Sequence, residues 1–192
     1  VPASDRSGQA LLRIYRARER RAGGRLAEAE QLHEEAFELA RDANDQKLIQ
    51  VASTNLGDLA LADDRIDSAE QHLRAALAAW RERRVPPSPG ILINWAALQR
   101  ARGRLAEAMA ALDEASAGAP PDTLWAIHRD RGLTAEKAGR LDEAERWYRE
   151  AIGVIETLRD SSAPPTSLAE FFERRWAPFQ YLFALQVSRG DA

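Results

Sequence analysis

The stretch that decides the fold is DEAERWYREAI at residues 142–152, in which Ala144 and Ala151 stand seven residues apart around Tyr148. The same arrangement of two alanines around one larger residue occurs three times before it, in AEAEQLHEEAF at 27–37, DSAEQHLRAAL at 67–77 and AEAMAALDEAS at 106–116. The first alanines of successive stretches lie 40, 39 and 36 residues apart. A long period of this kind is typical of stacked structural repeats.

Each alanine pair is predicted to lie on a helix that packs against a partner helix. Seven residues make about two turns at roughly 3.6 residues per turn, so both alanines and the larger residue between them share one face. A second amphipathic stretch precedes each pair, and the two are separated by turn signals at Gly23-Gly24, Asp63-Asp64, Gly103 and Gly139. The pattern predicts helix–turn–helix pairs, with helices at about 5–22, 25–42, 46–62, 66–84, 90–101, 105–117, 122–138, 141–159 and 167–188.

The first helix of a pair carries a small residue twelve positions before the first alanine of the second helix. Gly57, Ala96 and Gly132 hold this position in the second, third and fourth pairs. A glycine inside a helix costs on the order of 1 kcal/mol relative to alanine, so it needs a packing reason. We expect these residues to make close contact with the alanine face of the partner helix.

Composition limits the functions that are open to the chain. The net charge of −3 gives no general attraction to nucleic acid or to an anionic membrane. There is no cysteine, which excludes disulfides, thiol catalysis and cysteine-ligated zinc. No apolar run approaches the roughly 18 residues that span a bilayer, and no signal-peptide pattern is present, so we expect no membrane partner and a cytoplasmic location. Since the chain starts at Val1 and its one methionine is Met109, we expect it to be a piece of a longer protein.

These features together resemble the tetratricopeptide repeat (TPR) family, whose signature combines Leu-Gly or a similar pair with an Ala, Leu or aromatic, Ala pattern. The matching residues are Leu56-Gly57, Ala69, Leu73 and Ala76, then Trp95-Ala96, Ala108, Leu112 and Ala115, then Gly132, Ala144, Tyr148 and Ala151. The period is longer than the family's usual length of roughly 34 residues. The resemblance implies an all-α, right-handed α-solenoid that forms a single array over 1–192. Its four repeats fall at about 5–43, 45–84, 88–118 and 121–160, and a terminal helix follows at 167–188.

The first helix departs from the family pattern. In the register of the other repeats, its expected apolar positions hold arginines: Arg13, Arg16 and Arg20. A slip of one residue, which the double glycine allows, would place Leu12 and Tyr15 there instead. The sequence leaves both registers open.

The C-terminal tail carries a second, looser resemblance. Its aromatic residues include Phe171, Phe172, Trp176, Phe179 and Phe183. This layout is similar to the region before the caspase-like peptidase domain of bacterial TPR–CHAT proteins. That resemblance implies a catalytic His and Cys beyond Ala192, outside this chain. The alternative is that the aromatic helix covers the end of the fourth repeat, as a terminal cap must.

No residue pattern predicts catalysis, a metal or a cofactor. The histidines, His33, His72 and His128, lack ligand-like spacing, so we expect structural or surface roles for them. The paired acids fall in turns or on solvated faces and build no cleft for acid–base chemistry. The arginines of the first helix are followed closely by glutamates, so we expect interhelical ion pairs and no nucleic-acid binding. We therefore expect that this chain is not an enzyme.

The TPR resemblance implies that the first helices line a concave groove, which identifies five candidate ligand-binding residues. They are Asn55 and Asp58 in the second repeat, Asn94 in the third, and Arg129 and Asp130 in the fourth. Asn55 and Asn94 hold equivalent positions, and an Asn amide can pair with both polar groups of a peptide unit. The alternative for both is a hydrogen bond to the local backbone or to water.

The function implied by the resemblance is a non-catalytic scaffold that binds a protein or peptide partner in the groove. The alternative is a regulatory or sensor region of a larger enzyme, such as a CHAT peptidase whose catalytic domain lies beyond this chain. A third interpretation is self-association through the C-terminal helix.

Overall fold

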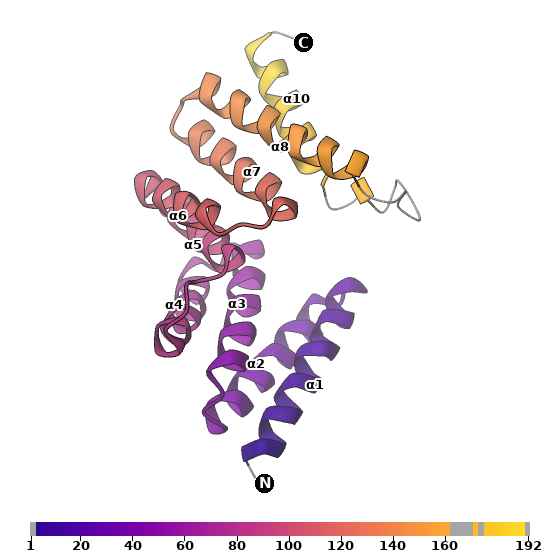
Figure 1. The fold of residues 1–192 in the computed structure, drawn as a ribbon, viewed down its shortest axis with the longest axis vertical. Coiled ribbons are helices and arrows are strands. Elements are labelled where there is room, and N and C mark those ends of the chain that lie inside the picture. The colour runs from indigo at the N-terminus through magenta and orange to yellow at the C-terminus, as the bar shows by residue number, and fades with distance from the viewer. Residues whose placement is uncertain (1–2, 162–170, 173–174, 191–192) are drawn as a thin grey trace. The chain divides into compact units, whose positions relative to one another are not determined.

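The structure, a computed structural model, describes residues 3–161, 171–172 and 175–190, and the regular elements in these ranges are all α-helices (Figure 1). The helices whose full bounds lie in the described ranges are α1 (Ala3–Ala22), α2 (Leu26–Asp42), α3 (Gln46–Ala62), α4 (Ile66–Arg83), α5 (Pro89–Ala101), α6 (Leu105–Ala117), α7 (Pro121–Lys137), α8 (Leu141–Ser161) and α10 (Ala177–Arg189). The expected all-α fold is confirmed, and α1 to α8 begin and end within about two residues of their predicted bounds. No helix of the described segments is long and apolar enough to cross a membrane.

The C-terminal helix differs from its prediction. A single helix was expected over 167–188, whereas the helical residues 171–172 are separated from α10, which begins at Ala177, by a turn at Arg175. Residues 167–170 and 173–174 of that prediction lie outside the described residues. Pro178 accounts for the new start at Ala177, because its fixed φ and missing N–H suit the first turn of a helix and disfavour the interior.

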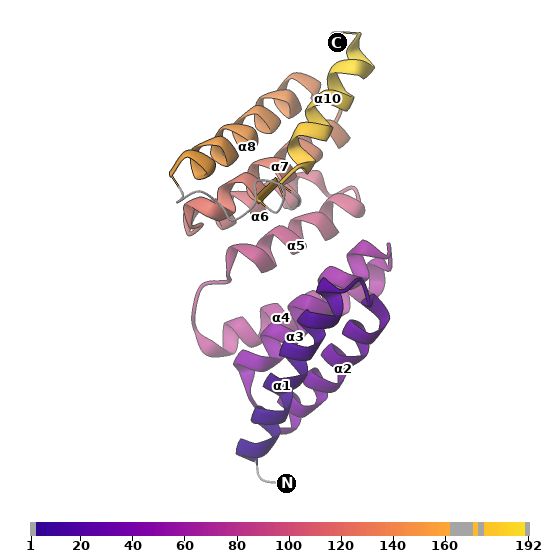
Figure 2. The ribbon, with the colours of Figure 1, turned by 90° about the vertical axis from the view of Figure 1, so that its right-hand side faces the viewer.

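The chain divides into two compact units, of which the first comprises residues 1–87. Within it, α1 packs against α2, α2 against α3, and α3 against α4, so that two antiparallel hairpins are stacked (Figures 1 and 2). The core of this unit consists of small and aliphatic side chains: Ala10, Ile14, Ala36, Ala40, Leu48, Ile49, Ala52 and Ala79.

The second unit comprises residues 88–192. Its hairpins are α5–α6 and α7–α8, which meet through α6 and α7 and through α5 and α7. Helix α10 packs against α8, where Leu185 joins a core with Ala135, Ala144 and Tyr148 (Figure 1). This is the position expected for a helix that covers the last hairpin.

One turn geometry follows five of the helices. Its middle residue has a left-handed backbone, with φ between 52° and 74°: Gly24, Asn44, Asp64, Gly103 and Gly139. The next residue donates its N–H to the carbonyl five residues earlier, as Arg140 does to Ala135 at 2.9 Å. Such a bond closes the end of a helix and satisfies a carbonyl that would otherwise lack a partner.

The close contact expected between the glycines and the alanine face of the partner helix is confirmed, and the large residue of that face makes it. The alanines of the pairs are fully buried, yet Gly57 and Gly132 face the large residue between them. A Cβ at Gly57 would lie 2.7 Å from Cγ of Leu73, and a Cβ at Gly132 would overlap the ring of Tyr148. The glycines therefore make room for a large side chain of the partner helix.

The structure resolves the register of α1. Leu12 and Tyr15 are exposed, whereas Ala17 is fully buried and stands twelve residues before Ala29, in register with Gly57. The register without the slip is therefore observed.

Two of the arginines in the expected apolar positions of α1 are neutralised by acids of α2. Arg13 pairs with Glu35 at 2.8 Å, and Arg20 pairs with Glu28 at 3.0 Å. The expected interhelical ion pairs are confirmed.

Candidate functional site

The five predicted groove residues lie on the first helices of their hairpins. Asn55 and Asp58 are half-buried on α3 in the first unit. In the second unit, Asn94 on α5 and Arg129 on α7 are half-buried, whereas Asp130 is buried. Asn55, Asn94 and Asp130 hold one repeat position, two residues before the small residue of the interhelical contact.

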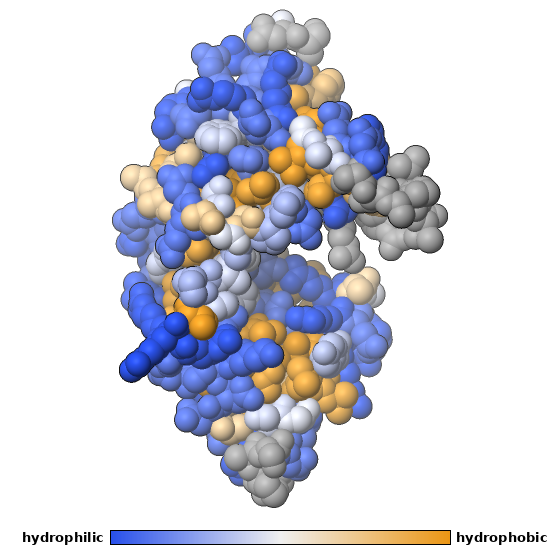
Figure 3. Space-filling model, viewed as in Figure 1, coloured by the Kyte–Doolittle hydropathy of each residue, from blue (hydrophilic) through white to orange (hydrophobic). Residues whose placement is uncertain are grey.

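The face around Asn55 and Asp58 extends onto α1. Leu11, Tyr15 and Arg18 precede Val51, Asn55 and Asp58 by one repeat of 40 residues. We call these six residues the N-terminal face. The side chains of Leu11 and Tyr15 are 42% and 56% exposed, and hydrophobic atoms gather over this part of the unit in Figure 3. Sequence reasoning missed the α1 residues because the register of that helix was open.

Local contacts restrain the polar residues of the N-terminal face. The Asn55 amide donates to the carbonyl of Val51 at 2.8 Å, which is the local backbone bond considered as the alternative. Its Oδ1 has no hydrogen-bond partner among the described residues. Asp58 forms an ion pair with Arg21 of α1 at 2.5 Å, so it links the two first helices of this unit.

In the second unit, Asp130 lies beneath two guanidinium groups. Arg100 of α5 donates through Nη1 to Oδ1 of Asp130 at 2.8 Å, and Arg129 donates through Nη2 to Oδ2 at 2.6 Å. The Asp130 side chain is 3% exposed, against 18% for Arg100 and 26% for Arg129. We call these three residues the arginine cluster. Asp130 is too deeply buried to contact a ligand directly. The exposed parts of the cluster belong to the two arginines.

Sequence reasoning did not select Arg100. Asp130 occupies the position of Asn55 and Asn94, and a carboxylate buried there needs cationic partners. Arg100 lies on the first helix of the preceding hairpin, so it is a possible partner by position. Its contact with Asp130 on α7 depends on how the two hairpins pack, which the sequence does not show.

Other groups surround the arginine cluster on α7. The guanidinium of Arg129 lies over the ring of Trp125, at 5.4 Å from the centroid. The hydroxyl of Thr134 donates to the backbone carbonyl of Asp130 at 2.7 Å. Lys137 approaches the carbonyl of Ala101 on α5 at 3.4 Å. The cluster is thus held by both α5 and α7.

The histidines lie in or near hairpin cores. His33 takes the large-residue position between Ala29 and Ala36, where burial, with smaller effects of Arg18 and Arg21, lowers its pKa to about 4. Its Nδ1 is buried without a hydrogen-bond partner.

The other two histidines are less deeply placed. Burial also lowers the pKa of His72 and of His128. His128 stacks on Trp147 at 5.4 Å. The structural role expected for His33 is confirmed.

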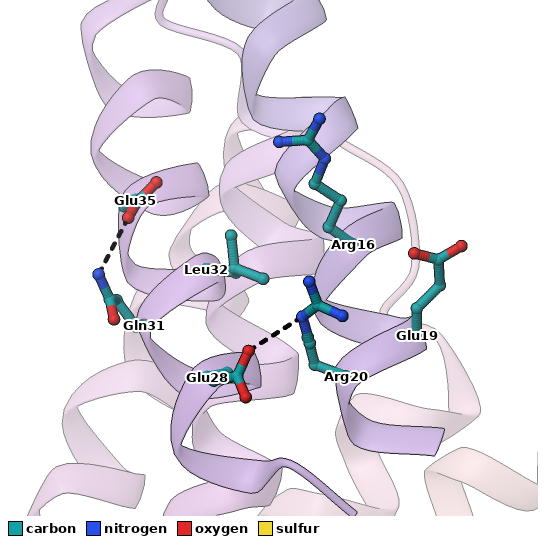
Figure 4. Close-up of a pocket in the computed structure, with 7 residues that line it drawn as sticks. All are labelled: Arg16, Glu19, Arg20, Glu28, Gln31, Leu32 and Glu35. Atoms are coloured by element: carbon teal, nitrogen blue, oxygen red, sulfur yellow. Dashed lines mark hydrogen bonds and ion pairs between the residues drawn. The ribbon is translucent and has the colours of Figure 1, made fainter. Parts of the chain in front are cut away.

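A surface hollow between α1 and α2 is lined mostly by charged side chains (Figure 4): Arg16, Glu19, Arg20, Glu28, Gln31, Leu32 and Glu35. Arg20 pairs with Glu28 across it, and Gln31 donates to Glu35 at 3.3 Å. Arg13, which lies outside the lining, pairs with Glu35, so two of the three lining carboxylates are held in ion pairs.

Within the described ranges, no group of three or more His, Asp or Glu side chains has the geometry to hold a metal ion. The pKa of the Tyr148 hydroxyl is raised by burial and by its hydrogen bond to Glu136, which makes this phenol a structural donor. The predicted groove residues therefore lie on two candidate ligand surfaces, the N-terminal face and the arginine cluster.

Comparison with known proteins adds one homologue. No protein-family model matches the chain. Over 137 residues, 71% of its length, the chain is 33% identical to the regulatory protein AfsR of Streptomyces griseus, and the match spans 13% of that protein. The chain is thus a polypeptide of packed helical hairpins with a weak homologue among regulatory proteins.

Proposed function

We propose that this chain is a TPR-type scaffold that binds a segment of a partner protein, without catalysis, along the first helices of its hairpins. The observation that carries the proposal is the N-terminal face. There, exposed Leu11 and Tyr15 of α1 offer apolar contact at the repeat positions that Val51 and the half-buried Asn55 hold on α3. Large exposed apolar side chains grouped with polar groups are a common mark of a protein-binding surface.

Selection from a random peptide library against the whole chain tests the proposal. We expect enriched peptides to bind reproducibly, and Tyr15→Ala with Asn55→Ala to weaken the peptides that contact the first unit by about tenfold. The melting temperature should stay nearly constant, because Tyr15 is exposed and Asn55 bonds only to its own helix. Asn94→Ala provides the equivalent test in the second unit.

A matched control is Gln71→Ala on α4, a second helix, which should leave peptide binding unchanged. Failure to enrich any peptide would count against a peptide-binding scaffold. Equal loss of stability and binding in the Asn55 variant would assign that residue a structural role.

A second candidate, favoured by the similarity to AfsR, is a regulatory segment of a larger protein. The CHAT peptidase expected from the tail is one form of it. The two candidates are compatible, since a regulatory segment can act by binding a partner. The sequence of the full gene product tests the CHAT form: a caspase-like block with His and Cys after Ala192 supports it, and any other continuation contradicts it.

A further inference from the structure

We infer that the arginine cluster is a binding site for one carboxylate side chain, Asp or Glu, of a protein partner. The inference rests on the proposed function and specifies the chemistry of the partner at one point of the second unit. It also assigns Asp130 a new role, in which the buried carboxylate positions Arg100 and Arg129 and does not itself contact the partner.

The charge around the cluster is unbalanced. The cations are Arg100, Arg129 and Lys137, and the carboxylates are Asp130 and Glu136. Glu136 accepts a hydrogen bond from the buried Tyr148 hydroxyl at 2.6 Å. Three cations against two carboxylates leave one positive charge, which a single monoanion neutralises.

Neighbouring charges do not remove this surplus. Arg131, also on α7, turns to Asp113 of α6 at 2.7 Å. Arg140 pairs with Glu143 at 3.0 Å on the following helix. Each of these pairs is neutral in itself, so the surplus belongs to the cluster.

Both arginines keep hydrogen-bond donors for a ligand. Arg100 uses only Nη1 toward Asp130, which leaves Nε and Nη2. Arg129 uses Nε and Nη2 toward Asp130, which leaves Nη1. Within the described segments these remaining donors have no partner. Unlike Nε of Arg131, they are not buried. They are therefore accessible to an incoming carboxylate.

The buried carboxylate prepares the arginines for binding. Guanidinium and carboxylate groups match in geometry, and their hydrogen bonds are charge-assisted. Because Asp130 already restrains both guanidiniums, less side-chain entropy is lost when the ligand binds. A phosphate dianion would leave an excess negative charge on the site, so the charge balance favours a carboxylate.

The first test uses hexaglutamate as the probe and the arginine Nε–Hε signals of the whole chain, recorded by NMR. We expect hexaglutamate to shift the Arg100 and Arg129 signals, and hexaglutamine to leave them in place. Arg129→Gln should abolish the shift at Arg100, and Arg129→Lys, which keeps the charge, should retain part of it. Arg149→Gln is the matched control, because Arg149 is exposed on α8 and pairs only with Glu145.

Circular dichroism should show unchanged helix content in each variant. Equal shifts with hexaglutamine, or an unchanged shift in Arg129→Gln, would overturn the inference. Tighter binding of inorganic phosphate than of hexaglutamate would also overturn it, in favour of a phosphate site.

The second test separates this inference from the proposed function. In the library peptides that bind the second unit, one Glu of the peptide is replaced with Gln. This replacement should weaken binding to the native chain about tenfold, and it should hardly change binding to the Arg129→Gln variant. Peptides that bind without any dependence on Glu would leave the scaffold function standing and refute the carboxylate site. A chain that binds no library peptide but still shows the hexaglutamate shifts would refute the proposed function alone.

Discussion

At the scale of single residues, the contact between Gly132 and Tyr148 leaves no room for a side chain at position 132. Tyr148 is fully buried and its hydroxyl is fixed by Glu136 at 2.6 Å, so its ring has little room to move. The corresponding contact of Gly57 is with Leu73, and in the third repeat Ala96 stands at the position opposite Leu112. A leucine partner therefore tolerates a methyl group at this position.

Gly132→Ala should destabilise the second unit by roughly 1–3 kcal/mol, because the new Cβ overlaps the Tyr148 ring. Gly57→Ala should change stability far less, since the better helix propensity of Ala offsets the displacement of Leu73. Gly153→Ala is the control: no atom lies within 4 Å of its added Cβ, so it should stabilise by roughly 0.5–1 kcal/mol. Urea unfolding measures all three. A Gly132→Ala variant as stable as Gly153→Ala would contradict the predicted overlap.

His33 makes the stability of the first unit depend on pH. Its folded pKa of about 4 lies below the ordinary 6.5, so the unfolded chain takes up a proton as the pH falls past 6.5 and the folded chain does not. Stability is therefore complete above pH 6.5 and decreases down to pH 4, by at most roughly 3 kcal/mol. His33→Leu, which copies Leu73, should remove this decrease and raise stability at pH 7. Urea unfolding from pH 4 to 7 measures the slope, and a slope equal to that of the native chain would assign it to other groups.

At the scale of helices, the sequence predicted most of the fold because each turn is local. The left-handed residue at Gly24, Gly103 or Gly139 ends one helix, and the alanine pair starts its pattern a few residues later. Both signals are fixed by neighbouring residues, so no tertiary information is needed. Asn44 and Asp64 serve in the same turn, as Asn and Asp tolerate a positive φ better than most residues.

Features that depend on contacts between distant residues could not be predicted from the sequence. The register of α1 was ambiguous because its arginines occupy apolar positions, and their neutralisation by Glu28 and Glu35 depends on how α2 packs. The aromatic residues before α10 predict one continuous helix, whereas Pro178 favours a new helix start at Ala177. The candidate site was limited in the same way, since Asp130 was selected by position but its burial beneath Arg100 comes from α5.

At the scale of the whole molecule, the repeats share one framework and differ in the residues that the first helices carry. The same repeat position is held by Tyr15, Asn55, Asn94 and Asp130. It therefore carries an aromatic ring in the first repeat, an amide in the second and third, and a buried carboxylate in the fourth. The small packing residue two positions later changes little in type: it is Ala17, Gly57, Ala96 and Gly132 in the four repeats. If the proposed scaffold function holds, we expect first-helix residues of this kind to select the partner, because their substitution leaves the core intact.

The second unit also carries a stripe formed by Trp176, the N-cap of α10, and by Gln180, Phe183 and Val187 of that helix. Steps of four, three and four residues place them on one side of the helix. Trp176, Phe183 and Val187 are each more than half exposed. The stripe contains no ionisable side chain, so two copies can meet along it without repulsion between like charges.

We propose that the chain self-associates through this α10 stripe, and sedimentation velocity at increasing concentration tests it. The native chain should shift from monomer toward dimer as concentration rises, because pairing buries three large apolar side chains. Phe183→Gln with Val187→Gln should keep it monomeric, with unchanged helix content since both positions are exposed. The control, Leu11→Gln with Leu12→Gln, removes exposed apolar side chains from α1 and should still dimerise. A native chain that stays monomeric throughout, or a control that loses the dimer, would rule out the α10 stripe as the interface.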